Sequence, residues 1–208
     1  TARLHDALVR TAGAFEQTMA GLDNAVRLGR GRVEVHTSTV VANQNLPHLG
    51  DILALLRARG ADQVVLNAMQ ANGRAATHFD RLFPRYSEIS GAFSRLLAAA
   101  GEQQPPVFLV DVPACTTQAL PAYHRGWVEG YVHHEVVDGG EENGEGVSPR
   151  RASSDQRLVE RRRADFDAAR RSKRAECARC RYDPVCEGVW NRYLERFGWE
   201  EFEPVAGP

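Results

Sequence analysis

Three of the four cysteines lie within ten residues, in the segment CARCRYDPVC (177–186). Cys177 and Cys180 are two residues apart, a spacing that lets two thiolates from one turn face a common centre. Cys186 adds a third thiol, and the fourth cysteine, Cys115, lies far upstream in DVPAC. Four thiolates suit either a tetrahedral zinc ion or a [4Fe–4S] cluster, and the spacing alone does not choose between them. The sequence therefore predicts a metal site with these four cysteines as its ligands.

Two alternatives to this ligand set stay open. The thiols could be free or buried without a metal, which we favour less because three thiols among ten mostly polar residues are poorly placed for a core. His133 or His134 could also replace Cys115 as the fourth ligand. Since adjacent residues of a strand point to opposite faces, at most one of the two histidines would serve.

Helical and strand patterns alternate through the first 115 residues. We expect helices at 13–29, 42–60 and 87–101, strands at 33–41, 62–70 and 105–115, and a polar loop at 71–86. This α-β-α-β-α-β order predicts right-handed crossovers and a parallel sheet. Three strands are few for such a sheet, so the pattern is that of the second half of a larger α/β barrel, and in isolation it should be marginally stable or oligomeric.

The rest of the chain has a different composition. A Gly-, Glu- and Ser-rich linker is expected at 136–156, followed by a basic, solvated helical stretch at 157–176. The tail places Trp190, Tyr193, Leu194 and Phe197 on one helical face, which predicts a lid packed on the domain. The predicted division of the chain is 1–115 for the half-barrel, 116–155 for an irregular segment with the acidic linker, and 156–208 for the cysteine-containing extension.

Composition excludes several classes of function. The 26 Lys and Arg balance the 27 Asp and Glu to a net charge of −1, which predicts neither nucleic acid nor an anionic membrane as a partner. No apolar run approaches the ~20 residues of a membrane span, and the first residues have no signal-peptide pattern. Four cysteines are too few for a disulfide-dense secreted scaffold, so we expect a cytoplasmic protein.

Several segments, in this order, resemble a known family. HDALVRTAGAFEQTMAGLDNAVRLG, VEVHTSTVVANQN and LPHLGDILALLRARGADQVVLNAMQANGRA resemble the later half of a radical S-adenosylmethionine (radical SAM) barrel. CARCRYDPVCEGVWNRYLERFGWEEF resembles the SPASM/twitch extension, which holds an auxiliary [4Fe–4S] cluster in that family. The resemblance covers 5–115 and 175–205. It implies an α/β fold, a partial (β/α) barrel of the TIM type with a small C-terminal iron–sulfur-binding extension.

The sequence also departs from that family. Its Cys-x3-Cys-x2-Cys motif, which binds the catalytic cluster, is absent, and the GGEE at 139–142 lies in the acidic linker rather than after a barrel strand. We therefore expect a C-terminal fragment, a split subunit or a degenerate relative. A missing N-terminal half or a partner chain would carry the SAM cluster. Because reductive cleavage of SAM needs an iron with an open coordination site, this chain alone should be inactive in that reaction.

Polar residues near the ends of the expected strands are candidates for SAM binding in the intact enzyme, as the resemblance implies. These are Thr37, Thr39, Asn43, Asn45, Asn67, Gln70, Gly73 and Arg74. Sites of barrel enzymes are built at the carboxyl ends of the strands. The Asn and Thr side chains could equally cap helices or satisfy loop backbone, and Asp111 could point into the barrel or cap a turn.

The leading functional hypothesis follows from the resemblance. It is the C-terminal part of a radical SAM protein that binds an auxiliary [4Fe–4S] cluster and supports radical-based modification of a peptide or small metabolite. One alternative is a non-enzymatic, zinc-stabilised binding domain. Another is an accessory subunit that completes a barrel with a separate chain. No recognition motif in 116–135 identifies the substrate.

Overall fold

A computed structural model of the 208-residue chain describes residues 1–29, 32–71, 73–100, 106–117, 169–184 and 186–206. The predicted acidic linker, most of the predicted basic helical stretch, and His133 and His134 lie outside the described residues. The expectations for these segments stay predictions.

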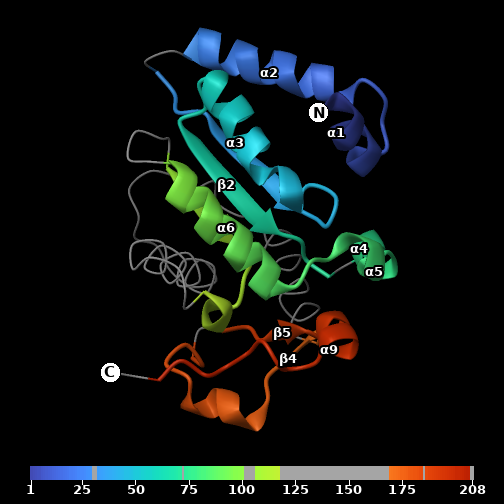
Figure 1. Cartoon of the computed structure of the whole chain (residues 1–208), viewed down its shortest axis with the longest axis vertical. Coiled ribbons are helices and arrows are strands. Elements are labelled where there is room, and N and C mark those ends of the chain that lie inside the picture. The colour runs from blue at the N-terminus through green and yellow to red at the C-terminus, as the bar shows by residue number, and fades with distance from the viewer. Residues whose placement is uncertain (30–31, 72, 101–105, 118–168, 185, 207–208) are drawn as a thin grey trace, which may run out of the picture.

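The centre of the fold is a parallel sheet of three strands in the order β1-β2-β3 (Figure 1). These are β1 (His36–Val41), β2 (Gln63–Ala68) and β3 (Val107–Val110), each shorter than the run predicted for it. Thr37 lies in register with Val64, and Leu66 with Leu109. The predicted parallel order is confirmed for these strands. Among the described residues the sheet stays open, so a half-barrel remains a prediction.

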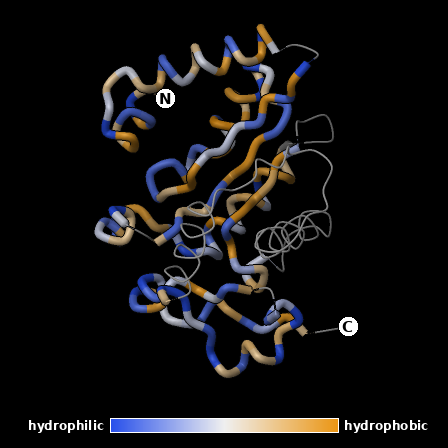
Figure 2. The backbone as a smooth tube through the Cα atoms, turned by 180° about the vertical axis from the view of Figure 1, so that it is seen from behind, coloured by the Kyte–Doolittle hydropathy of each residue, from blue (hydrophilic) through white to orange (hydrophobic). Residues whose placement is uncertain are grey.

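Helices pack against one face of this sheet. They are α2 (Ala14–Gly29), α3 (Leu49–Ala58) and α6 (Tyr86–Ala100). The bounds of α2 and α6 are within one residue of the predicted ones, whereas α3 begins seven residues later than predicted, after a turn and the 3-10 helix η1 (Leu46–His48). Figure 2 shows hydrophobic and hydrophilic residues alternating along α2, as an amphipathic helix requires. The large core side chains from these helices are Met19, Leu22, Leu49, Leu53, Leu56, Tyr86, Ile89, Phe93 and Leu96.

Strand residues alternate between this core and the opposite face. Val64, Leu66 and Leu109 belong to the core cluster. Phe108 and Val110 are also buried but lie outside that cluster, because they point to the other side of β3. The sheet therefore has two distinct faces, one packed on helices and an opposite one that carries Phe108 and Val110.

The structure adds three helices that the sequence patterns did not predict. One is α1 (Ala2–Val9), joined to α2 by the side chain of Asp6, which accepts hydrogen bonds from Gly13 N at 2.7 Å and Phe15 N at 2.8 Å. The other two, α4 (Gly73–Thr77) and α5 (Phe79–Leu82), occupy the segment expected to be a polar loop, so that expectation was wrong. Phe79 explains the difference, because it is buried in the core and draws the segment onto the domain.

The C-terminal segment forms a small unit below the carboxyl end of β2 (Figure 1). It contains an antiparallel pair, β4 (Arg171–Ser172) and β5 (Val189–Trp190), a 3-10 helix η3 (Ala175–Arg179) and the helix α9 (Asn191–Phe197). The prediction of a helix up to residue 176 is wrong at Arg171 and Ser172, which form β4. Trp190 lies in β5 rather than in the helix.

Aromatic packing joins this unit to the rest of the protein. Tyr193 is fully buried, with ring contacts to Phe79, Tyr86, Phe197 and Phe202. The prediction that the tail packs on the domain is confirmed, since these rings belong to the same core cluster or pack against it. Of the helices described here, none combines the length and the apolar character needed to cross a bilayer.

Candidate metal centre

Cys115 is held in a tight turn directly after β3. Asp111 ends the strand with φ 58°, a left-handed conformation that a residue other than glycine adopts at a cost of about 1 kcal/mol or more. The chain then enters the 3-10 turn η2 (Ala114–Thr116). Thr116 Oγ1 donates to the Pro113 carbonyl, and Thr117 Oγ1 to the Ala114 carbonyl, both at 2.8 Å. These bonds fix Cys115 at the carboxyl end of the sheet.

The other three cysteines lie on successive turns of the C-terminal unit. Cys177 N donates to Arg174 O at 2.9 Å, Cys180 N to Cys177 O at 2.8 Å, and Cys186 N to Tyr182 O at 2.8 Å. Each bond closes a turn of three or four residues. The Cys-x2-Cys spacing therefore becomes a compact 3-10 turn, as the sequence predicted.

Two backbone amides donate to cysteine sulfurs. Gly188 N lies 3.3 Å from Cys186 Sγ, and Val205 N lies 3.4 Å from Cys180 Sγ. Donors of this kind stabilise negative charge on sulfur. The first bond depends on glycine: Gly188 has φ 91°, and a Cβ there would lie 2.6 Å from the Ser172 carbonyl oxygen.

The thiols influence one another's ionisation. Burial raises the pKa of Cys115 to about 12, with further contributions from the charges of Cys186, Cys180 and Cys177. Burial also raises the pKa of Cys186. Cys115 packs against the same buried cluster as Val189 and Trp190, so the fold brings it to the part of the molecule that carries the other cysteines, although it is 62 positions from Cys177 in the sequence.

The side chains do not form a closed metal centre. All four cysteines are free thiols. Within the part of the chain that the structure describes, no three His, Cys, Asp or Glu side chains are grouped closely enough to hold a metal ion. The fit to a metal group thus rests on the donor chemistry, four thiols in one region with amide donors to two of them, rather than on formed coordination geometry.

Side chains that the sequence analysis did not single out hold the cysteine turns in place. Lys173 Nζ bonds both the carbonyl oxygen of Asp183, at 2.6 Å, and its Oδ1, at 3.0 Å, across the cysteine turns. Arg171 forms an ion pair with Glu187 at 2.7 Å and stacks on Trp190, its guanidinium carbon 4.1 Å from the ring centroid. No sequence motif indicated these pairings.

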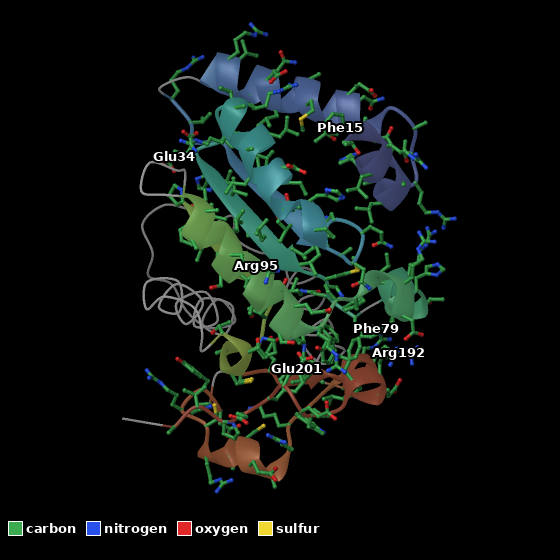
Figure 3. All side chains as sticks on the ribbon, in the orientation of Figure 1. Phe15, Glu34, Phe79, Arg95, Arg192 and Glu201 are labelled. Carbon is green, nitrogen blue, oxygen red and sulfur yellow. The ribbon has the colours of Figure 1, made fainter. Side chains whose placement is uncertain are left out.

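A buried polar group docks the cysteine unit onto the sheet domain. Glu201 Oε1 accepts from Arg85 Nη1 at 2.9 Å, and its Oε2 accepts from the Tyr193 hydroxyl at 2.8 Å and Ser87 N at 3.1 Å. The Tyr193 hydroxyl in turn accepts from Tyr86 N at 2.9 Å. Figure 3 places Glu201 where the C-terminal unit meets α6. These contacts fix the position of three cysteines relative to the fourth.

The residues predicted to bind SAM separate into groups. Thr37 and Thr39 share the face of Val64 and Leu66, the helix-packed face, and Thr37 Oγ1 donates to Gln63 O at 3.2 Å. Asn67 lies on the opposite face. The structure therefore does not bring the two threonines together with Asn67.

The two asparagines after β1 serve the local backbone. Asn45 is buried, accepts from Ala42 N and donates to Val40 O, each at 2.8 Å, and so closes the turn after the strand. Asn43 Nδ2 donates to the carbonyls of Arg81 and Phe83 at 3.3 and 3.1 Å. Their structural role is the capping alternative that the sequence left open, while ligand binding stays a prediction.

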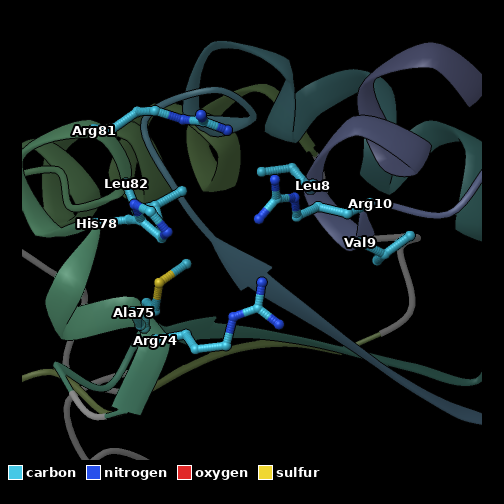
Figure 4. A pocket seen from close by; sticks show the side chains of 9 residues that line it. Leu8, Val9, Arg10, Arg74, Ala75, His78, Arg81 and Leu82 are labelled. Carbon is cyan, nitrogen blue, oxygen red and sulfur yellow. The ribbon is translucent and has the colours of Figure 1, made fainter.

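The remaining candidates lie at the carboxyl ends of β2 and β3. Gln70 Nε2 is 3.5 Å from Asp111 Oδ2, so these two side chains meet beside the turn that carries Cys115. Gly73 begins α4 with φ 51°, and Arg74 lines a pocket between α1 and α4–α5 (Figure 4). Together with Asn67 of β2, these residues lie near the carboxyl ends of the strands, where barrel enzymes build their sites.

Comparison with known proteins gives one curated relative. Over 76 residues, 36% of this chain, the sequence is 37% identical to the AdoMet-dependent heme synthase of Oleidesulfovibrio alaskensis (strain ATCC BAA-1058 / DSM 17464 / G20). The aligned part is 19% of that protein, so the chain spans about a fifth of the length of the relative it matches. No protein-family model matches the chain, and no solved structure matches it significantly.

Proposed function

We propose that this chain is part of a radical SAM protein and that Cys115, Cys177, Cys180 and Cys186 hold an auxiliary [4Fe–4S] cluster. The observation that carries the proposal is that Cys115 packs against the same buried cluster as Val189 and Trp190, the strand that follows Cys186, so that thiols from two distant segments lie in one part of the fold. A relative whose name states dependence on AdoMet supports the family.

The donor set suits such a cluster. A [4Fe–4S] cluster takes four thiolates and supplies one-electron transfer when bound. The amides of Gly188 and Val205 donate to two of the sulfurs and lower the cost of their negative charge. The partial burial of all four cysteines limits access of water. The chain's own contribution is thus to position, neutralise and shield the ligands.

Four protein ligands would leave no iron free for substrate, which favours electron relay or structural support as the role of this region. In the intact protein we propose that it supports a radical-based modification. The name of the relative, a heme synthase, favours a small metabolite over a peptide as the substrate. SAM itself would bind in the intact protein, near Asn67 and Gln70, at the carboxyl end of the sheet.

The proposal includes a partner for the open side of the sheet. Val40 lies near the carboxyl end of β1, on the face opposite the helices, and is 49% exposed although it is apolar. A barrel would cover this face with the strands that precede β1. Those strands would come from the N-terminal half of the same protein or from a separate chain that carries the SAM cluster.

A structural zinc ion is the second candidate for the same cysteines. The observation that favours it is the small size of the C-terminal unit, in which strands of only two residues are framed by cysteine turns. Such a unit is typical of a zinc-stabilised module, which gains its folding energy from the metal. In that case the region would be a binding domain without redox chemistry.

Metal analysis of anaerobically reconstituted protein tests the proposal. We expect about four irons and four sulfides per chain, with loss of the iron in Cys177→Ala/Cys180→Ala. Cys115→Ala tests the distant ligand, and Ser38→Ala, an exposed position on β1, is the matched control that should keep its iron. One zinc without iron would overturn the cluster in favour of the zinc module. Full iron retention in Cys115→Ala would remove that residue from the ligand set.

A further inference from the structure

A pocket of about 610 Å³ lies between α1 and the α4–α5 pair, beside the end of β2 (Figure 4). It is separate from the candidate metal centre, since no cysteine lines it. Its volume falls within the range of about 300–1,000 Å³ that is usual for small-molecule sites. The pocket is therefore sized for a small molecule rather than for the surface of a macromolecule.

The polar side chains that line this pocket are three arginines and one histidine. Arg10, Arg74, Arg81 and His78 line it, and no carboxylate does. Figure 4 shows the three guanidinium groups entering from different sides of the space. Within the described ranges of the chain, none of these arginines forms an ion pair that would neutralise it.

Nearby carboxylates are engaged elsewhere. Asp6 of α1 accepts from the amides of the α1–α2 turn. Asp80 of α5 faces α9, where it pairs with Arg196 at 2.8 Å and Arg192 at 3.8 Å. In a chain with a net charge of −1, three arginines around one cavity, none of them paired with a carboxylate of the described residues, are a local concentration of positive charge that overall composition does not explain.

Hydrogen bonds hold the backbone of two of these arginines in place. Arg10 ends α1 in a left-handed conformation with φ 59°, and its N–H bonds the carbonyl of Asp6. The carbonyl of Arg81 accepts from Asn43 Nδ2 at 3.3 Å and Gln44 Nε2 at 3.1 Å. Because these segments are held in place before a ligand arrives, less ordering entropy is lost on binding.

The rest of the lining is apolar. It comes from Leu8 and Val9 of α1, Met69 just after β2, Ala75 of α4 and Leu82 of α5. Val9 is 50% exposed, a large apolar side chain that a ligand in the pocket would cover. The site thus offers several guanidinium groups to anionic groups and an apolar wall to the body of the same molecule.

We propose that this pocket binds a small organic molecule that combines an apolar body with two or more carboxylate or phosphate groups. Guanidinium forks bind either oxyanion through paired hydrogen bonds, and several arginines favour a ligand with several anionic groups. The inference goes beyond the proposed cluster and does not depend on it, because the two sites share no residue.

Isothermal titration of the full 208-residue chain tests the pocket with defined probes. Benzene-1,3,5-tricarboxylate supplies three carboxylates on an apolar ring, benzoate a single carboxylate, and inorganic pyrophosphate an anion without an apolar body. We expect the tricarboxylate to bind at least about tenfold more tightly than benzoate. Tighter binding than pyrophosphate is also expected. If pyrophosphate binds more tightly than the tricarboxylate, the apolar part of the proposal is overturned.

Variants locate the binding. Arg74→Gln should weaken tricarboxylate binding about three- to tenfold, and Arg10→Gln/Arg74→Gln further. Arg3→Gln is the matched control, an exposed arginine of α1 outside the pocket with the same change of net charge, and it should alter affinity less than about twofold. Equal losses in the control and the pocket variants would overturn the site. So would displacement of the tricarboxylate by SAM, which would assign Arg74 to the cofactor.

Discussion

The substitution Tyr193→Phe tests how the cysteine unit is docked onto the sheet domain. The Tyr193 hydroxyl accepts from Tyr86 N at 2.9 Å and donates to Glu201 Oε2 at 2.8 Å, in a place where the ring is fully buried. Burial raises the pKa of Tyr193, so the hydroxyl stays protonated and remains a donor at neutral pH. Removing only the oxygen leaves the aromatic packing intact and isolates the two hydrogen bonds.

The size of the expected destabilisation follows from the hydrogen bonds that Tyr86 and Glu201 lose. Tyr86 N becomes a buried donor without an acceptor, which costs about 1–3 kcal/mol. Glu201, whose side chain is 9% exposed, loses one donor but keeps Arg85 Nη1 and Ser87 N. We therefore expect the free energy of unfolding to fall by about 2–3 kcal/mol. For a chain of this size that corresponds to a decrease in Tm of about 4–12 °C.

Thermal and urea denaturation followed by circular dichroism measure this change. A double-mutant cycle with Glu201→Gln separates the two bonds, and we expect a coupling energy of about 1 kcal/mol between positions 193 and 201. If Tyr193→Phe lowers the free energy of unfolding by less than about 0.5 kcal/mol, the reasoning is refuted, because a buried amide without an acceptor costs more than that. A coupling energy of zero would refute the bond to Glu201 alone.

Two further predictions concern turns elsewhere in the fold. Gly188→Ala should lower the free energy of unfolding by about 1–3 kcal/mol in urea denaturation, because φ is 91° and the new Cβ would meet the Ser172 carbonyl. The control Gly21→Ala, in the open interior of α2, should leave that free energy unchanged or raise it by up to about 1 kcal/mol. Equal effects of the two substitutions would contradict the steric argument. The hydrogen bond from the Phe15 amide lowers the pKa of Asp6 below 3.8, so this carboxylate stabilises the fold above that pH, and its contribution is lost as pH falls through the folded pKa. We expect the Tm difference between the wild type and Asp6→Asn to shrink between about pH 5 and pH 3, and a constant difference would exclude this origin.

Much of the sheet domain could be predicted from local sequence. The apolar spacing through Leu49, Leu53 and Leu56 fixes a helix, and the nearly continuous apolar run of β2 fixes a buried strand, because both patterns depend only on neighbours along the chain. Alternation of the two then predicts a parallel sheet. The segment 71–86 was missed for the same reason, since α4 and α5 are too short to show a period and form where Phe79 packs on distant rings.

The candidate site was only half visible in the sequence. The spacing of Cys177, Cys180 and Cys186 predicts a compact turn of thiols, but nothing local relates them to Cys115. Register decided which predicted polar residues share a face, as with Thr37 on the helix side and Asn67 on the other, because a side chain's face depends on strand pairing rather than on residue type.

By itself, the sequence determined the residue types that can do chemistry and the local elements that carry them: the four thiols, the helices and the buried strands. Only the tertiary structure brings the two cysteine segments toward one another, through the Tyr193 and Glu201 contacts that pack the C-terminal unit on the sheet domain. It also gathered Arg10, Arg74 and Arg81 from separate helices around one pocket. The physical reason is that hydrophobic burial and the satisfaction of buried polar groups act between residues close in space, whatever their separation along the chain.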